Sequence, residues 1–276
     1  MEERLWESAS PRQEGLQAIL SGRQLSKRYG AVVSLCEVDI DVYGGVVLGL
    51  IGDNGAGKST LVKILVGAEQ ADQGQLVFLG ETRRWRSPDA ARAAGIETVF
   101  QDLGLCEELS VWRNFCLGRE GRGGLENGTS RKVKRFRKIE RREVRDDCMD
   151  ALLEFGLHLS SPDVQVKALS GGERQALAIA RAAHFGARML VLDEPTSALS
   201  VRETERVLTT VRAAAERGMG CVVVSHAIGH IEEVADQVLV LQHGRGIMMT
   251  FRGELSRREL EDLVAGRSQA HAEKDV

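Results

Sequence analysis

Several short apolar runs divide the chain, and each is followed by polar or glycine-rich residues. The longest runs cover residues 46–51, 189–192 and 221–224. Uninterrupted apolar segments of this length are typical of parallel strands that are buried on both faces. The three runs therefore predict the centre of an α/β fold. The residues that follow them are candidates for a site, because ligands bind at the carboxyl ends of parallel strands.

Further short runs predict strands around this centre. Residues 18–43 carry β-like runs on both sides of a turn at residues 29–30, which predicts an antiparallel β edge. We also expect strands at residues 76–79 and 96–100 and a hairpin within residues 238–249. The sequence thus predicts a parallel sheet with antiparallel additions.

Helical spacing of apolar residues appears in the remaining segments. It follows residues 52–60 and stops at Gly67, and a short helix is expected from Pro88 to Ala94, with proline in its first turn. Residues 102–165 are predicted to be mostly helical, with a glycine-rich break at residues 118–128. This region differs from the strand-rich segments on either side.

A basic run at residues 131–145 contains nine lysines and arginines. Apolar residues within and after it fall on one helical face: Val133, Phe136, Val144, Cys148, Leu152 and Phe155. The favoured interpretation is the solvated face of an amphipathic helix. A surface for nucleic acid or lipid headgroups is the weaker alternative, because no aromatic residues interleave with the charges.

Composition excludes several classes of protein. The chain has 276 residues, 43% hydrophobic and 28% charged, as is ordinary for a globular protein, and a net charge of −3 that gives no general attraction to nucleic acid. No apolar stretch approaches the about 20 residues of a membrane helix, and no signal peptide opens the sequence. The five cysteines are odd in number and lack C-x-x-C spacing, so we expect reduced thiols in the cytosol.

The segment after the first apolar run fits G-x-x-x-x-G-K-[ST], the pattern of a phosphate-binding loop. It consists of Gly52, Asp53, Asn54, Gly55, Ala56, Gly57, Lys58, Ser59 and Thr60. Its glycines let backbone N–H groups converge on an anion, and the following helix adds the positive end of its dipole. Lys58 is expected to reach the terminal phosphates and Ser59 to ligate Mg²⁺. A glycine-rich turn without a ligand is the alternative, and such a turn rarely follows a buried strand.

Polar residues at other strand ends suit the same chemistry. Asp193 ends an apolar run and can hold Mg²⁺, and Glu194 is placed to act as a general base, although an acidic turn before proline would look similar. His226 follows another run, and a lone histidine is usually structural. Gln101 follows a predicted strand, where a solvated loop residue is the alternative. Tyr29 suits stacking on a base or packing in a turn equally well.

Two helices are expected to begin with S-x-x-E capping boxes. The first box joins Ser170 to Glu173, and the second joins Ser200 to Glu203. The first encloses Gly171 and Gly172, which cost helix stability, about 1 kcal/mol each relative to alanine. Bare backbone at a helix N-terminus is well suited to approach a phosphate, so this segment is a candidate for nucleotide binding as well as a capped helix.

Together these motifs resemble the ATP-binding subunits of ABC transporters over about residues 18–260. The phosphate loop resembles the family's Walker A motif, residues 169–173 its LSGGQ signature with glutamate in the last place, and Asp193 with Glu194 its Walker B motif and catalytic glutamate. Gln101 corresponds to the Q-loop, His226 to the switch histidine and Tyr29 to the adenine-stacking ring. The resemblance implies a P-loop NTPase, RecA-like α/β core with an antiparallel β edge, and a helical subdomain that carries the signature.

The resemblance also implies boundaries and a mechanism. We expect a flexible extension at residues 1–17, one nucleotide-binding domain at 18–265 with a helical subdomain at about 102–180, and a flexible tail at 266–276. Two cassettes would pair head to tail, with ATP and Mg²⁺ between the Walker loop of one and Ser170, Gly171 and Gly172 of the other. Glu194 would activate water, and Gln101 and His226 would sense Mg²⁺ and the γ-phosphate, with Gln101, Ser59 and Asp193 near the metal.

Smaller segments resemble the branch of the family that imports ribose, xylose, fructose and similar sugars. They lie at residues 52–54, 101–103, 117–120 and 201–204. The chain carries one set of motifs and so resembles the single-cassette form. This implies transmembrane permease subunits as partners, a second cassette as a homodimer, an indirect link to a solute-binding protein, and a place on the cytoplasmic face of the membrane.

The sequence departs from the family at the D-loop, residues 197–200. The usual S-A-L-D reads Ser197-Ala198-Leu199-Ser200 here, so serine still caps the helix but the family's carboxylate is missing. Two other functions remain as alternatives. One is a soluble ABC ATPase that acts on nucleic acid or the ribosome through residues 131–145, and the other is an ATP-binding regulator with little hydrolysis, against which Glu194 and His226 argue.

Overall fold

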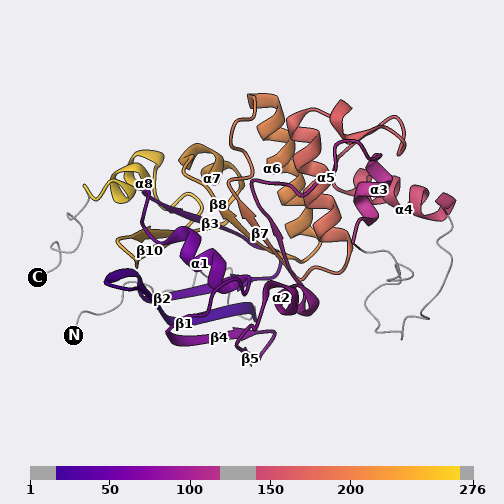
Figure 1. Ribbon diagram of the computed structural model, residues 1–276. Helices are drawn as coiled ribbons and strands as arrows, with labels where there is room; N and C mark the ends of the chain where they lie inside the picture. Colours follow the sequence, from indigo (N-terminus) through magenta and orange to yellow (C-terminus); the bar gives the residue numbers. More distant parts are fainter. Residues whose placement is uncertain (1–16, 119–140, 268–276) are drawn as a thin grey trace, which may run out of the picture.

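The computed structural model describes residues 17–118 and 141–267. In this part of the chain, strands build two sheets, and helices cover the larger of them (Figure 1). The main sheet has the strand order β10 (Arg245–Phe251), β9 (Gln237–Gln242), β3 (Val47–Gly52), β8 (Gly220–Val224), β7 (Met189–Asp193) and β6 (Ile96–Val99). Its strands from β9 to β6 pair in parallel, and β10 pairs antiparallel with β9.

The predicted antiparallel edge forms a sheet of its own. Its strand order is β2 (Val32–Tyr43), β1 (Ala18–Tyr29), β4 (Gln73–Phe78) and β5 (Glu81–Arg83). Strands β1 and β2 form the hairpin expected around residues 29–30. The antiparallel sheet lies with α1 (Lys58–Leu65) on one side of the main sheet, because their apolar residues share a hydrophobic core with that face.

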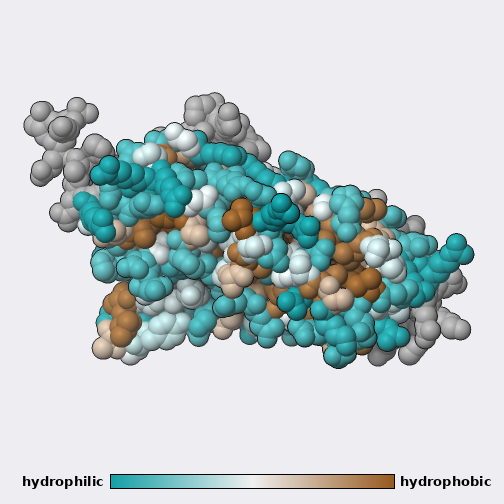
Figure 2. Space-filling view, turned by 90° about the horizontal axis from the view of Figure 1, so that it is seen from above, coloured by the Kyte–Doolittle hydropathy of each residue, from teal (hydrophilic) through white to brown (hydrophobic). Residues whose placement is uncertain are grey.

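Helices cover the opposite face of the main sheet. They include α5 (Gly171–His184), α6 (Val201–Glu216) and α7 (Ile228–Val234), and α8 (Arg257–Val264) packs beside them. Alternate residues of each central strand point into the two cores. Along β3, Leu48 and Leu50 lie in the core shared with the antiparallel sheet. Val47 and Ile51 lie in the core shared with the helices. The continuous apolar runs are therefore explained by burial on both faces, as predicted. Seen from above, the outer surface is mainly hydrophilic, with hydrophobic residues in separate patches (Figure 2).

The region expected to be mostly helical is less regular than predicted. Its described part contains α3 (Val111–Cys116) and α4 (Arg141–Glu154) with extended and turn residues around them, and the 3₁₀ turn η1 (Val166–Ala168) follows just after it. Cys148, Leu152 and Phe155 are buried on one face of α4 or just after it, as the pattern indicated.

The short helix α2 (Pro88–Ala94) has the expected bounds, and Ser87 caps it by accepting a hydrogen bond from the Ala90 N–H. The hairpin of β9 and β10 is also as predicted. Three expectations concern segments that lie wholly or mostly outside the described residues: the extension at 1–17, most of the basic run at 131–145, and the tail at 266–276.

Candidate functional site

The carboxyl ends of four parallel strands place candidate residues along one edge of the main sheet. Strand β3 leads into the phosphate loop, β8 into Ser225 and His226, β7 into Glu194, and β6 toward Gln101. Strand β8 pairs with both β3 and β7, so it lies between the phosphate loop and the acidic residues. Residues that are distant in the sequence therefore meet at one edge, which is where ligands bind in open α/β sheets.

The phosphate loop has a backbone that requires glycine. Gly52 and Gly57 have φ angles of 155° and 106°. A Cβ atom at position 52 would lie 2.3 Å from the Leu241 carbonyl oxygen, and one at position 57 would lie 2.6 Å from the Ser34 carbonyl oxygen. The loop is thus wedged between β9 and β2. Any larger residue at position 52 or 57 would therefore change the shape of the loop.

Lys58 begins α1 and folds back over this loop. Its Nζ donates hydrogen bonds to the carbonyl oxygens of Gly52 at 2.7 Å and Asp53 at 3.1 Å. The Asp53 side chain in turn accepts a hydrogen bond from the Asn54 N–H at 2.7 Å. The ammonium group therefore lies over the concave loop, where it can meet an anion.

The β1–β2 hairpin leans against the same loop. The hydroxyl groups of Ser34 and Thr60 lie 2.7 Å apart, which joins β2 to α1. Tyr29, at the end of β1, keeps 42% of its surface exposed, and the Lys27 ammonium lies 5.5 Å from the centre of its ring. The ring is thus an exposed aromatic surface on the hairpin that contacts the phosphate loop.

Two consecutive carboxylates lie at the end of β7: Asp193 is its last residue and Glu194 follows it. Burial raises the pKa of the Asp193 carboxyl, and the neighbouring charge of Glu194 raises it further, against an opposing effect of Lys58. A cation beside Asp193 would relieve this cost because it favours the charged form. Glu194 has a φ of 51°, and its N–H donates to the Val224 carbonyl oxygen at 2.9 Å, which holds it in this unusual conformation.

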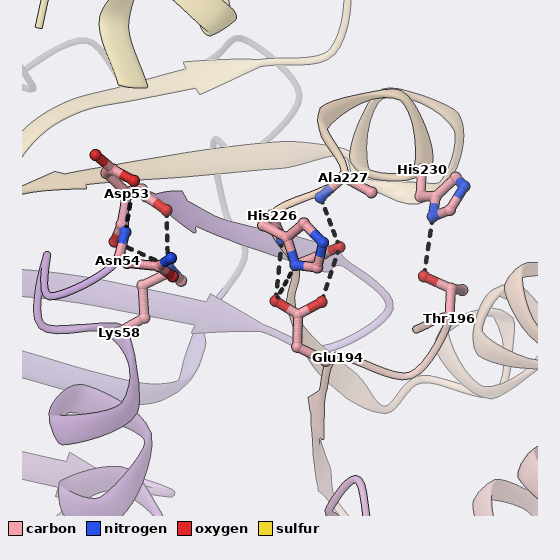
Figure 3. A network of polar contacts seen from close by, with 10 residues as sticks. Asp53, Asn54, Lys58, Glu194, Thr196, His226, Ala227 and His230 are labelled. Carbon is pink, nitrogen blue, oxygen red and sulfur yellow. Dashed lines mark hydrogen bonds and ion pairs between the residues drawn. The ribbon is translucent and has the colours of Figure 1, made fainter. Parts of the chain in front are cut away.

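His226 holds the carboxylate of Glu194 (Figure 3). Glu194 Oε1 accepts a hydrogen bond from the His226 backbone N–H at 3.0 Å and lies 2.9 Å from the His226 Nδ1. The histidine side chain is 71% exposed and the glutamate side chain 23% exposed. The sequence predicted both residues at this edge, and the structure shows that they contact each other directly.

A second histidine near this pair was not found from the sequence. His230 lies on α7, and its Nδ1 is 2.9 Å from the Thr196 Oγ1, as Figure 3 shows. Thr196 is buried and lies two residues after Glu194. The loop before α7, through His226, and α7 itself, through His230, therefore each contact the segment at the end of β7. His226 and His230 are four residues apart, which would suggest a shared face only on a helix. The sequence did not predict a helix in this segment, so the spacing did not point to His230.

The signature loop, residues 170–172, lies at the start of α5. Ser170 caps the helix as predicted: its Oγ accepts from the Glu173 N–H at 3.2 Å, and Glu173 Oε2 accepts from the Ser170 N–H at 2.9 Å. Gly172 donates its N–H to Glu203 Oε1 on α6 at 3.2 Å. The hydrogen bonds of this loop thus run to its own helix and to α6, and not to the phosphate loop of the same chain.

Gln101 is exposed just beyond β6, next to a groove of about 410 Å³. The groove is lined from β6, α2, α5 and the segment after α3, and it includes the partly exposed Phe100 and Leu117 and the charged Arg92 and Arg181. It combines exposed apolar side chains with charges, as a surface for another protein does.

The oxygen atoms available for a metal ion are hard donors. Mg²⁺ prefers oxygen ligands, which the Ser59 hydroxyl, the Asp193 carboxylate and the Gln101 amide provide. The raised pKa of Asp193 shows that its charged form is disfavoured, and a nearby cation would stabilise that form. Mg²⁺ usually takes only one or two protein ligands and completes its shell with water and phosphate oxygens. The residues present therefore fit such an ion.

Comparison with known proteins gives consistent matches. A family model described as "ABC transporter" matches residues 35–197. The fructose import ATP-binding protein FrcA of Rhizobium meliloti is 43% identical over 228 residues, which cover 82% of this chain and 86% of that protein. The xylose/arabinose import ATP-binding protein XylG of Sulfolobus acidocaldarius is 38% identical over 248 residues, covering 89% and 93%. A solved nucleotide-free ATP-binding cassette from an ABC transporter has a TM-score of 0.73 at 25% identity and covers 91% of this chain and 96% of its own.

Proposed function

Since the chain belongs to the ABC transporter family of ATP-binding proteins, which are ATPases, we propose that it powers the import of a monosaccharide through membrane permease subunits. Its relatives that are named for fructose import and for xylose/arabinose import support a sugar as the cargo. The observation that carries the ATPase function is the Glu194 carboxylate, held by His226 at the sheet edge that also carries the phosphate loop.

ATP would be held by the phosphate loop and by the hairpin beside it. The N–H groups of the loop and the N-terminus of α1 suit the phosphates, and Lys58 adds a positive charge. Tyr29 offers an exposed ring for the adenine base. Mg²⁺, held by Ser59 and Asp193 with Gln101 nearby, supplies positive charge to the phosphate oxygens when it is bound.

Glu194 is proposed as the general base that orients and deprotonates the attacking water. Its carboxylate is partly exposed at the sheet edge and is kept in one position by two groups of His226. His226, which is largely exposed, can move its ring between Glu194 and a phosphate without disturbing the core. Glu194 would therefore contact the reacting water, and His226 would link Glu194 to the end of β8, the strand between the phosphate loop and Asp193.

The second half of each ATP site is proposed to come from another cassette. Ser170, Gly171 and Gly172 have the backbone of an anion site at the start of α5, but their hydrogen bonds run to Glu173 of the same helix and to α6. A head-to-tail homodimer would bring this loop to the phosphates held by the partner. Hydrolysis should then depend on the concentration of dimer.

Permease subunits are proposed to dock in the groove beside Gln101. The groove is lined by β6, α2, α5 and the segment after α3, so a protein bound in it would contact both the strand that leads toward Gln101 and the helix that begins with the signature loop. In residues 17–118 and 141–267, no helix is long and apolar enough to cross a membrane. The proposed partners supply the membrane path, and we place the cassette on the cytoplasmic face of the membrane. A periplasmic or extracellular solute-binding protein would be linked to it only indirectly, through the permease.

The nucleic-acid alternative is not supported. The relatives with high identity are named for sugar import, and the described end of the basic run is engaged within the chain itself. Arg145 forms a hydrogen-bonded ion pair with Asp163, and its guanidinium lies 5.6 Å from the centre of the Trp112 ring. These contacts are those of a helix that packs on its own subdomain.

The test uses the full chain together with its permease subunits in vesicles. Wild-type protein should hydrolyse ATP and take up a labelled fructose, xylose, arabinose or ribose, and Glu194→Gln should abolish both while it retains ATP binding and traps a dimer. Glu233→Gln, the same change at an exposed position on α7, should leave both activities intact. Normal hydrolysis by Glu194→Gln would refute the catalytic assignment. ATP-driven transport of another solute, with none of these sugars, would refute the cargo.

A further inference from the structure

One carboxylate joins the D-loop helix to the signature loop of the same chain. Glu203 Oε2 accepts hydrogen bonds from the Ser200 N–H at 3.0 Å and from the Ser200 Oγ at 2.7 Å. Its other oxygen, Oε1, accepts the Gly172 N–H at 3.2 Å. Glu203 therefore caps its own helix, α6, and at the same time holds the first turn of α5.

The backbones meet closely at this point. A Cβ atom at position 172 would lie 2.7 Å from the Glu203 Cβ and 3.0 Å from its Cα, and one at position 171 would lie 3.0 Å from the Leu199 Cδ2. One turn further along α6, Arg206 pairs with Glu173 at 3.3 Å. Glycine at position 172 is thus required by the packing of the loop against α6, quite apart from any ligand, and a Cβ atom at position 171 would press on the Leu199 side chain.

The link consists of charge-assisted hydrogen bonds from neutral donors to the Glu203 carboxylate. Hydrogen bonds from the Ser200 side chain and N–H, together with that from Gly172, lower the pKa of Glu203 to about 2. The carboxylate therefore stays charged near neutral pH. Its donors include the Gly172 N–H and two groups of Ser200, which lie 28 residues apart in the sequence.

We propose that Glu203 is a positioning residue for ATP hydrolysis, which locks the D-loop to the signature loop so that both approach the partner's nucleotide as one unit. This inference rests on the proposed function, in which residues 170–172 complete the ATP site of the partner. The D-loop of this chain has Ser200 where the family's carboxylate usually stands, and Glu203 provides a carboxylate one helical turn later. It acts on the signature loop of its own subunit.

A different role for the same contact makes an opposite prediction. Because Glu203 occupies the Gly172 N–H, it could instead compete with a phosphate of the partner's ATP for this donor. Removing a competitor would lower the KM for ATP without lowering kcat. Removing a positioning residue would lower kcat and leave the KM nearly unchanged, because the phosphate loop and Tyr29, which hold most of the nucleotide, are not altered.

The experiment compares ATP hydrolysis by the full chain with its permease subunits for wild type, Glu203→Ala and Glu203→Gln. We expect Glu203→Ala to lower kcat by about tenfold, the scale of a small misplacement of a catalytic segment. Glu203→Gln should be intermediate, because its amide oxygen can accept from Gly172 or from Ser200 but not from both.

The matched control is Glu259→Ala on α8. Glu259 Oε2 accepts from the Ser256 N–H and Oγ, both at 2.7 Å, so this variant loses the same kind of helix cap away from the signature loop. It should lose thermal stability and keep its kcat. An unchanged kcat in Glu203→Ala and Glu203→Gln, or a lower KM with unchanged kcat, would overturn the proposal. Absence of hydrolysis in the wild type would instead refute the proposed function.

Discussion

Asp236 anchors the strand that leads into the phosphate loop, and its removal gives a prediction of defined size. Its Oδ2 accepts the Val47 N–H at 2.9 Å, and Arg212 of α6 binds both of its oxygens at 2.7 and 2.8 Å. The side chains of the pair are 30% and 33% exposed. The carboxylate thus joins the start of β3 to a helix on the face of the main sheet.

The expected cost of Asp236→Ala follows from these contacts. A hydrogen bond to a charged group contributes about 1.5–3 kcal/mol, whereas an exposed ion pair contributes about 0–1 kcal/mol. The pair is half-buried and bidentate, and its removal also leaves the Val47 N–H without this acceptor. We therefore expect the free energy of unfolding to fall by about 3 kcal/mol, between the values for exposed and buried pairs.

The assay is urea unfolding at pH 7, with a double-mutant cycle. Asp236→Ala and Arg212→Ala should cost less together than the sum of the two, with a coupling of about 1–2 kcal/mol. The control is Glu261→Ala, which breaks the exposed Arg257–Glu261 pair on α8 and should cost less than about 0.5 kcal/mol. A cost for Asp236→Ala no larger than that of Glu261→Ala, or no coupling, would refute the anchoring role.

The same carboxylate predicts a pH dependence. Burial raises the pKa of Asp236, but the hydrogen bonds from Arg212 and Val47 outweigh burial and lower it below its ordinary value of 3.8. A group with a lowered folded pKa stabilises the fold fully above its unfolded pKa and loses that contribution as pH falls through the folded pKa. The stability difference between wild type and Asp236→Asn should hence be constant near neutral pH and should shrink as the pH falls below 3.8.

Two further changes test the site. Lys58→Ala should weaken ATP binding at least tenfold, because it removes the charge over the phosphate loop. The affinity is measured by fluorescence of a labelled nucleotide, with Lys63→Ala, exposed on the same helix, as the control. Equal affinity in the two variants would contradict the phosphate-loop assignment. His230→Ala and Thr196→Val should each lower kcat with little change in KM, and together no more than either alone, because both break one contact; additive losses would show that the two residues act separately.

The sequence predicted the parts of the fold that depend on local pattern. Burial on both faces produced the continuous apolar runs of β3, β7 and β8, and the capping boxes at Ser170 and Ser200 appear as hydrogen bonds. The predicted antiparallel strands are confirmed, and they form a sheet of their own, because their apolar faces pack with α1 over the main sheet.

Contacts between distant segments could not be derived from local pattern. The reach of Glu203 to Gly172 and the approach of His230 to Thr196 depend on how α6 and α7 pack, which spacing along the chain does not specify. The roles of the site residues stay predictions. What the structure adds is that Glu194 and His226 touch, and that the signature loop faces α6.

The position of β8 has a consequence for the size of the site. Neighbouring strands in a sheet lie about 4.8 Å apart, so one intervening strand sets β3 and β7 at roughly 10 Å from each other. The backbone positions of Lys58, after β3, and of Asp193 and Glu194, at the end of β7, are therefore separated by the width of one strand, whatever their side chains do. The width of the gap is therefore a property of strand order, and His226 follows two residues after the end of the middle strand, β8, which lies between its two sides.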